Sequence, residues 1–279
     1  MTPPPILVAQ ISDLHVKRPG EQAYRKVDTA AALARCIAAL NRFTPRPQLA
    51  VVSGDLVDTP AAEEYEHLEQ LLAPLEIRLA VIPGNHDSRT LLRAAFPAQP
   101  YARASGALDL SLAIGPLDIV LLDSSVPGAS HGRLAPATLD WLDVTLAASA
   151  SRPALLFLHH PPFGTGIAHM DSQNLHNAAD LAAVLQRHPR TRLVAAGHVH
   201  RAVSTMFAGI AATICPAPNH AVALDLGERD PPTFKIEPPA FHMHAWFPGA
   251  GFGDLVTHLV PIGDFDGPHP FFDAQGTQL

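Results

Sequence analysis

Val81-Ile82-Pro83-Gly84-Asn85-His86-Asp87 is the stretch of sequence that most directly indicates the fold. The short apolar run from Leu79 to Ile82 predicts a buried strand, and Pro83-Gly84 ends it. An amide, an imidazole and a carboxylate follow at once, and these groups suit metal or proton chemistry. In open α/β sheets such chemistry lies just beyond the carboxyl ends of the strands. For one such stretch alone, a turn with helix-capping Asn and Asp is the alternative, but the same layout recurs along the chain.

Four other predicted strand ends carry the same kinds of side chain. They are Asp13-x-His15, Gly54-Asp55, His159-His160 and Gly197-His198-Val199-His200. In an extended segment residues i and i+2 point the same way, so each of the two x-separated pairs is predicted to reach one ion. Each motif alone is common in structural turns. All five in this order, each after an apolar run, predict one shared metal site.

The elements between these motifs predict the fold class. Helices are expected over Val27–Phe43, Ala61–Leu72, Thr90–Phe96, Pro136–Ala148 and Leu175–Gln186, with an irregular loop over Phe163–Asn174. Strands dominate from Arg201 onward. Alternating strands and helices followed by a run of strands predict an α/β fold with two stacked sheets and helices outside. We expect residues 1–262 to form a single domain, and residues 263–279 to form a tail packed on the domain or at a subunit interface.

Composition narrows the function. Of the 279 residues, 47% are hydrophobic and 16% charged, which favours a sizeable core. The net charge is −7 and there is no basic run, which argues against binding of a nucleic-acid polymer. No apolar run is long enough to cross a bilayer and the N-terminus lacks the pattern of a secretory signal, so a cytoplasmic protein is expected. Cys36 and Cys215 are expected to be buried thiols, with a disulfide between them as the alternative.

The candidate ligands are carboxylate, imidazole and amide groups without a thiolate, a set that suits Mn, Fe, Co or Zn. There are seven of them: Asp13, His15, Asp55, Asn85, His159, His198 and His200. Seven ligands are too many for one ion and fit two, and two ions can clamp the attacking and leaving oxygens of an in-line displacement. Asp55 is the natural bridge, because a carboxylate has two oxygens.

In these motifs the chain resembles the calcineurin-like metallophosphoesterase superfamily, whose pattern is Asp-x-His, Gly-Asp, Gly-Asn-His-Asp/Glu, His and Gly-His-x-His. The resemblance implies a four-layer α/β/β/α sandwich with a binuclear metal centre. Carried over residue by residue, it implies one metal held by Asp13, His15, Asp55 and His200, and another held by Asp55, Asn85, His159 and His198. His86 matches the family's catalytic histidine, which Asp87 would orient.

Within that superfamily the chain looks closest to bacterial class III cyclic nucleotide phosphodiesterases and binuclear glycerophosphodiesterases, through His159-His160-Pro161-Pro162 and residues 171–178 and 241–261. This resemblance implies a hydrolase of small phosphodiesters, either cyclic nucleotides or glycerophosphodiesters. A hydroxide held between two divalent or trivalent ions would attack phosphorus. The expected substrate contacts are His160, Asp171, Asn177 and His220, with structural roles as the alternative.

Three other functions are alternatives. A phosphomonoesterase or promiscuous phosphatase would use the same fold and metals. An inactive interaction scaffold is disfavoured because all seven ligand positions are filled. A zinc hydrolase of amides or thioesters is disfavoured because the sequence has no His-x-His-x-Asp-His cluster. The apolar, aromatic tail favours a homodimer or a higher homo-oligomer.

Overall fold

Two β-sheets form the centre of the structure, a computed structural model that describes residues 4–149, 151–227, 231–249 and 254–279. Within these residues the first sheet has the strand order β13 (Leu255–Pro261), β12 (Ala240–Trp246), β1 (Ile6–Ile11), β2 (Leu49–Ser53) and β3 (Leu79–Ile82). The second sheet has the order β4 (Leu110–Ile114), β5 (Leu117–Leu122), β6 (Ala154–Leu158), β7 (Thr191–Ala196), β9 (Ile210–Ile214) and β8 (Val203–Phe207).

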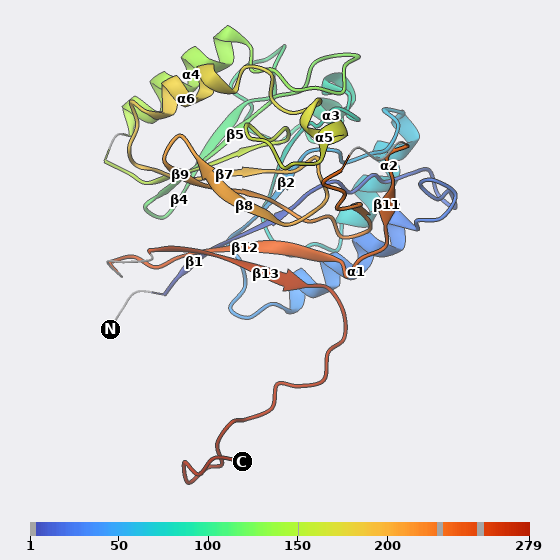
Figure 1. Cartoon of the computed structure of the whole chain (residues 1–279), viewed down its shortest axis with the longest axis vertical. Coiled ribbons are helices and arrows are strands. Elements are labelled where there is room, and N and C mark those ends of the chain that lie inside the picture. Colours follow the sequence, from blue (N-terminus) through green and yellow to red (C-terminus); the bar gives the residue numbers. More distant parts are fainter. Residues whose placement is uncertain (1–3, 150, 228–230, 250–253) are drawn as a thin grey trace.

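Helices cover both outer sides of the paired sheets (Figure 1). On the first sheet lie α1 (Thr29–Arg42), α2 (Ala62–Leu72) and α3 (Arg89–Ala95), and on the second lie α4 (Pro136–Ala148) and α6 (Ala178–Leu185). The α1 segment folds this way because Asp28 caps its first turn by accepting from the Ala31 amide, and because Leu33, Ile37 and Leu40 bury one face. The expected α/β/β/α arrangement is confirmed.

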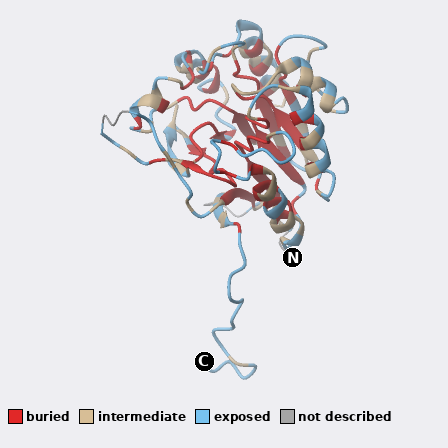
Figure 2. Cartoon of the chain, turned by 90° about the vertical axis from the view of Figure 1, so that its right-hand side faces the viewer, coloured by how far each residue is buried: buried red, intermediate tan, exposed pale blue. Residues whose placement is uncertain are grey.

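The interface between the sheets is mainly apolar, with Gln10 of β1 donating across it to the Ala196 carbonyl of β7. Val51 and Ile82 of the first sheet belong to the same buried cluster as Ile119, Leu155 and Phe157 of the second. The outer face of each sheet is buried under its helices in a separate cluster. Since β2 and β6 are buried on both faces, their sequences are continuous apolar runs rather than alternating ones. Figure 2 shows this buried interior.

Two expected segments differ in the structure. The predicted irregular loop contains a one-turn helix, α5 (Ala168–Asp171), and α6 begins at Ala178 rather than Leu175. The helix begins later than expected because the Leu175 amide donates to the Pro161 carbonyl and the His176 amide donates to the Gly132 carbonyl. These bonds hold the two residues in the loop.

In the part of the sequence after Arg201, where strands are expected to dominate, the apolar runs 221–226 and 233–236 form much shorter strands. They shrink to β10 (Ala221–Val222) and β11 (Phe234–Lys235), which pair antiparallel outside both main sheets. We call this pair the β10–β11 ribbon. With so few ladder bonds, it depends on side-chain contacts for its position.

The C-terminal segment Gly263–Leu279 extends away from the body of the molecule (Figure 1). It is exposed at every residue except Asp273, and its large apolar side chains include Phe265, Phe271 and Phe272. Cys36 and Cys215 are buried free thiols, as expected. In the part of the chain that the structure describes, no helix has the length and apolar character needed to cross a membrane.

Candidate metal centre

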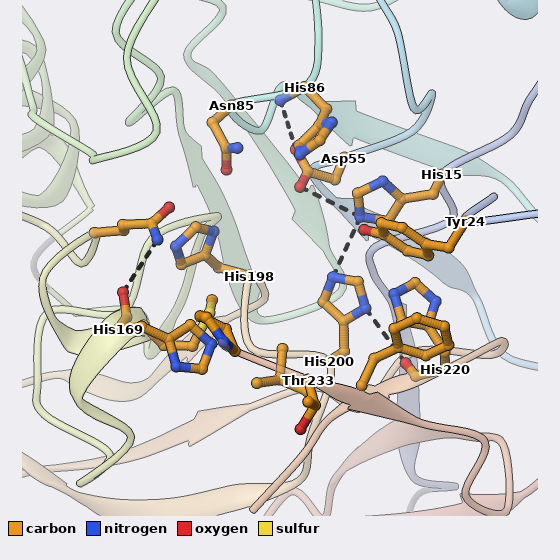
Figure 3. A pocket seen from close by; sticks show the side chains of 15 residues that line it. His15, Tyr24, Asp55, Asn85, His86, His169, His198, His200, His220 and Thr233 are labelled. Carbon is orange, nitrogen blue, oxygen red and sulfur yellow. Dashed lines mark hydrogen bonds and ion pairs between the residues drawn. The ribbon is translucent and has the colours of Figure 1, made fainter. Parts of the chain in front are cut away.

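The seven predicted ligands come from loops at one end of the two sheets. Strands β1, β2 and β3 run parallel to one another, as do β5, β6, β7 and β9, so their carboxyl ends lie together. Asp13, His15, Asp55 and Asn85 follow the first three strands, and His159, His198 and His200 follow β6 and β7. Five of the seven, together with His86, line a cavity of about 400 Å³ (Figure 3).

One group of ligand atoms gathers around Nε2 of His15. This nitrogen lies 3.2 Å from Nε2 of His200 and 3.5 Å from Oδ2 of Asp55. Nε2 of His200 lies 3.5 Å from Oδ1 of Asp13. Ligands about 2.0–2.2 Å from one ion are separated by about 3–3.5 Å, so these four atoms have the spacing of a coordination shell.

A second group gathers around Nε2 of His159. This nitrogen lies 3.1 Å from Oδ1 of Asn85, 3.2 Å from Nδ1 of His198 and 3.4 Å from Oδ2 of Asp55. The spacing again suits one ion. Oδ2 of Asp55 belongs to both groups, so a single carboxylate connects them.

Hydrogen bonds on the far side of three imidazoles fix which nitrogen faces the centre. Nδ1 of His15 contacts Oδ1 of Asp58 at 3.1 Å, and Nδ1 of His159 contacts the Ser53 carbonyl at 3.0 Å. Nδ1 of His200 contacts the His220 carbonyl at 3.3 Å. Each Nδ1 donates, which leaves the lone pair of Nε2 free for a metal. The donor chemistry and spacing therefore fit two metal ions.

Burial and charge set the protonation of these groups. Burial lowers the pKa of His198 and of His200 well below 6.5, so both rings are neutral at pH 7, as ligation requires. Burial also acts to lower the pKa of His159, but the Asp55 carboxylate outweighs it and raises the pKa to about 9. Burial opposes ionisation of Asp55, yet His159 and His86 hold its pKa well below the ordinary value. Metal binding at His159 therefore releases a proton.

The backbone of the ligand loops differs from the sequence-based interpretation. Asp13 (φ 58°), His15 (φ 45°), His198 (φ 74°) and His200 (φ 57°) adopt the left-handed conformation, so the two pairs are not extended. Asp55 is left-handed as well, at φ 50°. Such a conformation costs a non-glycine residue about 1–3 kcal/mol and clusters at functional sites. Each i, i+2 pair still reaches the centre, but through a turn.

Gly84 is required by the close approach of two loops. A Cβ atom on this residue would lie 2.5 Å from the backbone nitrogen of Asp55, where no side chain fits. The glycine of the Gly-Asn-His-Asp motif therefore lets the loop after β3 pass directly over the residue that joins the two groups of ligands.

His86 lies at the cavity, and its ring is oriented differently from the expectation. Nδ1 of His86 donates to the backbone carbonyl of Asp58 at 2.7 Å, which leaves Nε2 for a substrate. Asp87, expected to orient His86, accepts instead from the amides of Gly84 (2.9 Å) and Leu56 (3.1 Å) and from the Tyr65 hydroxyl (3.1 Å). The expected role of Asp87 is corrected: its carboxylate fixes the loops after β2 and β3.

Two of the four expected substrate contacts have structural roles. Asp171 accepts from the amides of Thr165 and Gly166, and Asn177 bonds both the amide and the carbonyl of Leu134. Neither is among the described residues that line the cavity. Their side chains satisfy backbone groups of the loop, and a contact of either with substrate stays a prediction.

The other two lie at the centre. His160 is buried, its Nδ1 lies 2.8 Å from the Ser124 hydroxyl, and its ring packs 4.8 Å from that of His198. His220 lines the cavity, and its ring lies 4.5 Å from that of His200. Nδ1 of His220 is buried with no hydrogen-bond partner in the described part of the chain.

Sequence reasoning missed Asp58. Its carboxylate accepts from Nδ1 of His15 and pairs with Lys17 at 2.8 Å, while its carbonyl holds His86. Burial acts to raise the pKa of Asp58, but the hydrogen bonds from His15 and Lys17 hold it well below 3.8. A carboxylate three residues after Asp55 was the available signal, although spacing alone does not show which histidine it contacts.

We expect the substitution Asp58→Asn to weaken binding of one metal ion by about 10–100-fold, because groups that orient a ligating histidine have effects of this size. Isothermal titration of the metal-free protein with Mn²⁺ measures it. Asp143→Asn, at an exposed carboxylate paired with His188, is the matched control. Unchanged affinity at both sites would show that Asp58 does not support His15.

Comparison with known proteins agrees with this geometry. A model of the calcineurin-like phosphoesterase family matches residues 6–202. A probable glycerophosphodiester phosphodiesterase of Arcobacter nitrofigilis is 38% identical over 97% of this chain and 98% of its own length. The 3′,5′-cyclic adenosine monophosphate phosphodiesterase of Escherichia coli K12 is 30% identical over 70% of each chain.

Solved structures share the fold. The crystal structure of a dimetal phosphatase from Danio rerio superposes with a TM-score of 0.69, covering 94% of this chain and 98% of that one. The two sequences are only 16% identical, so the likeness concerns the fold alone.

Proposed function

Since this chain belongs to the calcineurin-like phosphoesterase family, we propose that it is a metal-dependent phosphodiesterase that hydrolyses small phosphodiesters. The relatives divide between glycerophosphodiesters and cyclic nucleotides, so both classes are candidate substrates. The resemblance that the motifs indicated is confirmed by the family match.

The observation that carries the proposal is the position of Asp55. Its Oδ2 atom lies 3.5 Å from Nε2 of His15 and 3.4 Å from Nε2 of His159, and these nitrogens belong to different groups of ligands. We propose that Asp13, His15, Asp55 and His200 hold one ion, and that Asp55, Asn85, His159 and His198 hold the other. Bound ions would activate a water and neutralise charge on the phosphoryl oxygens.

We assign protonation of the leaving group to His86 and substrate binding to residues that line the cavity. Nδ1 of His86 is bonded to the Asp58 carbonyl, so Nε2 is the nitrogen that faces the substrate. We assign Nε2–H as the general acid that donates a proton to the leaving alkoxide. His220 is assigned to contact the substrate from the cavity wall, and His160 to support His198 through ring packing. Mn, Fe, Co and Zn all suit this ligand set.

The decisive test compares bis(p-nitrophenyl) phosphate with p-nitrophenyl phosphate, using metal-stripped protein before and after addition of Mn²⁺. We expect little hydrolysis without metal, restored hydrolysis with Mn²⁺, and a higher kcat/KM for the diester. A dominant rate with the monoester would replace the proposal with a phosphomonoesterase. Absence of both activities in protein with two bound ions would favour an interaction scaffold.

Four further expectations accompany this function. We propose that residues 1–262 form the catalytic domain and that the exposed tail mediates assembly of a homodimer or higher homo-oligomer. Size measurement of the full chain against one ending at Ile262 tests the second point. The cytoplasmic location and the lack of nucleic-acid polymer binding stay predictions.

A further inference from the structure

An aromatic wall on one side of the cavity has no part in metal binding. It consists of Tyr24 and Phe234, whose ring centroids lie 4.9 Å apart with 31° between their planes. The ring of His220 packs edge-on against both, at 5.2 Å from Tyr24 and 5.4 Å from Phe234. Figure 3 shows Tyr24 and His220 beside the histidines of the centre.

Tyr24 is held in an unusual position. Ala23 and Val27 exchange two backbone hydrogen bonds of 2.9 Å, and both are buried, so they close a tight turn with Tyr24 at its tip. Tyr24 has φ 52° and the next residue, Arg25, has φ 55°. The side chain is nevertheless 54% exposed. Strained residues of this kind cluster at functional sites, and here the strained turn places a half-exposed aromatic ring beside the cavity.

Phe234 reaches the cavity on the β10–β11 ribbon. Arg201 fixes this ribbon, because its guanidinium donates to the Val222 carbonyl at 2.9 Å and pairs with Glu237 at 2.8 Å. Val222 is the direct partner of Phe234 in the ribbon and lines the cavity as well. Two segments about 200 residues apart in sequence are therefore each braced to present one ring to the same space.

We infer that Tyr24 and Phe234 hold a planar ring carried by the phosphodiester, such as a nucleobase, while the phosphate binds at the metal centre. This inference rests on the proposed function. Tyr24 and Phe234 cover one face of each other, and the aromatic surface that they leave toward the cavity offers stacking to a planar ring but few hydrogen bonds to a polyol. The wall would therefore favour a nucleoside ester over a glycerol ester.

The test uses two compounds that differ only in the ring. Adenosine 5′-monophosphate and ribose 5-phosphate carry the same phosphate on the same sugar, and each is titrated into the Mn²⁺-loaded full chain. We expect the adenosine compound to bind at least about tenfold more tightly, within the range of base stacking on aromatic side chains. Tyr24→Ala and Phe234→Ala should each bring the two affinities within about twofold, and the ribose 5-phosphate affinity should stay unchanged.

Phe271→Ala is the matched control, because that ring lies in the C-terminal segment and is 82% exposed. Equal affinities in the wild-type protein, or a preference that survives in both wall variants, would overturn the inference. Hydrolysis of bis(p-nitrophenyl) phosphate is measured on the same preparations. If the protein hydrolyses the diester but shows no preference for the ring, only the inference about Tyr24 and Phe234 is refuted. If it prefers the ring but does not hydrolyse the diester, that inference is supported and the proposed phosphodiesterase reaction is refuted.

Discussion

Asp55→Asn should lower the rate of diester hydrolysis by about a thousandfold and reduce the metal content from about two ions to about one per chain. Oδ2 of Asp55 is the atom common to both ligand groups, and an amide lacks the charge and the second acceptor oxygen of a carboxylate. Metal ions stabilise a transition state of this kind by several kcal/mol, and each 1.4 kcal/mol lost is tenfold in rate. Rate and metal content are measured on the same sample, by assay and by elemental analysis.

Asp118→Asn is the control for this loss. Asp118 accepts from Arg152 at 2.7 Å near the start of β5, at the opposite end of the parallel strands from the ligand loops. It should keep both ions and the full rate, apart from a small loss of stability. If Asp55→Asn retained both ions and the wild-type rate, the assignment of a shared carboxylate would be refuted.

His86→Ala should lower kcat by about 10²–10⁴-fold while both metal ions stay bound. A positioned general acid contributes this much, and the His86 ring is excluded from both groups of ligands as we assign them. The loss should depend on the leaving group. An alkoxide needs a proton as it departs, whereas p-nitrophenolate departs without one. We therefore expect a larger loss for an alkyl diester than for bis(p-nitrophenyl) phosphate.

His67→Ala is the matched control for His86. Its Nδ1 also contacts a backbone carbonyl, that of Lys17 at 2.7 Å, but the ring is not among the described residues lining the cavity. Its substitution should leave kcat unchanged. Equal losses for both diesters in His86→Ala would assign the ring to electrostatic stabilisation of the phosphoryl group rather than to proton donation.

The layered fold and the location of the site could be predicted from the sequence. Apolar runs such as Leu49–Val52 and Ala154–Leu158 mark buried strands, and polar motifs directly after them mark the end of the sheet where they meet. This works because strand burial and the position of a loop depend mainly on local sequence. The predicted start of a helix was wrong where hydrogen bonds to other loops hold its first residues out of the helix, as at Leu175.

Roles that depend on a partner distant in sequence could not be predicted. Asp87 follows His86 directly, yet it bonds the amides of Gly84 and Leu56, while the carbonyl of Asp58 holds the His86 ring. Tyr24 is a single aromatic residue in a loop, and nothing in the sequence indicates that it meets a ring more than 200 positions later. Such contacts depend on how loops that are distant in sequence are placed relative to one another in the folded protein.

The place of β1 in the first sheet affects how the chain folds as it is made. β1 ends at Ile11 and lies between β2 and β12, and β12 begins only at Ala240. At translation rates of about 5–20 residues per second, about 10–50 s separate the synthesis of these two strands. For that time one edge of β1 lacks its partner on the ribosome-bound chain, and an open edge invites pairing with other chains. Nascent chains of this protein should therefore need a chaperone until the last quarter of the sequence emerges.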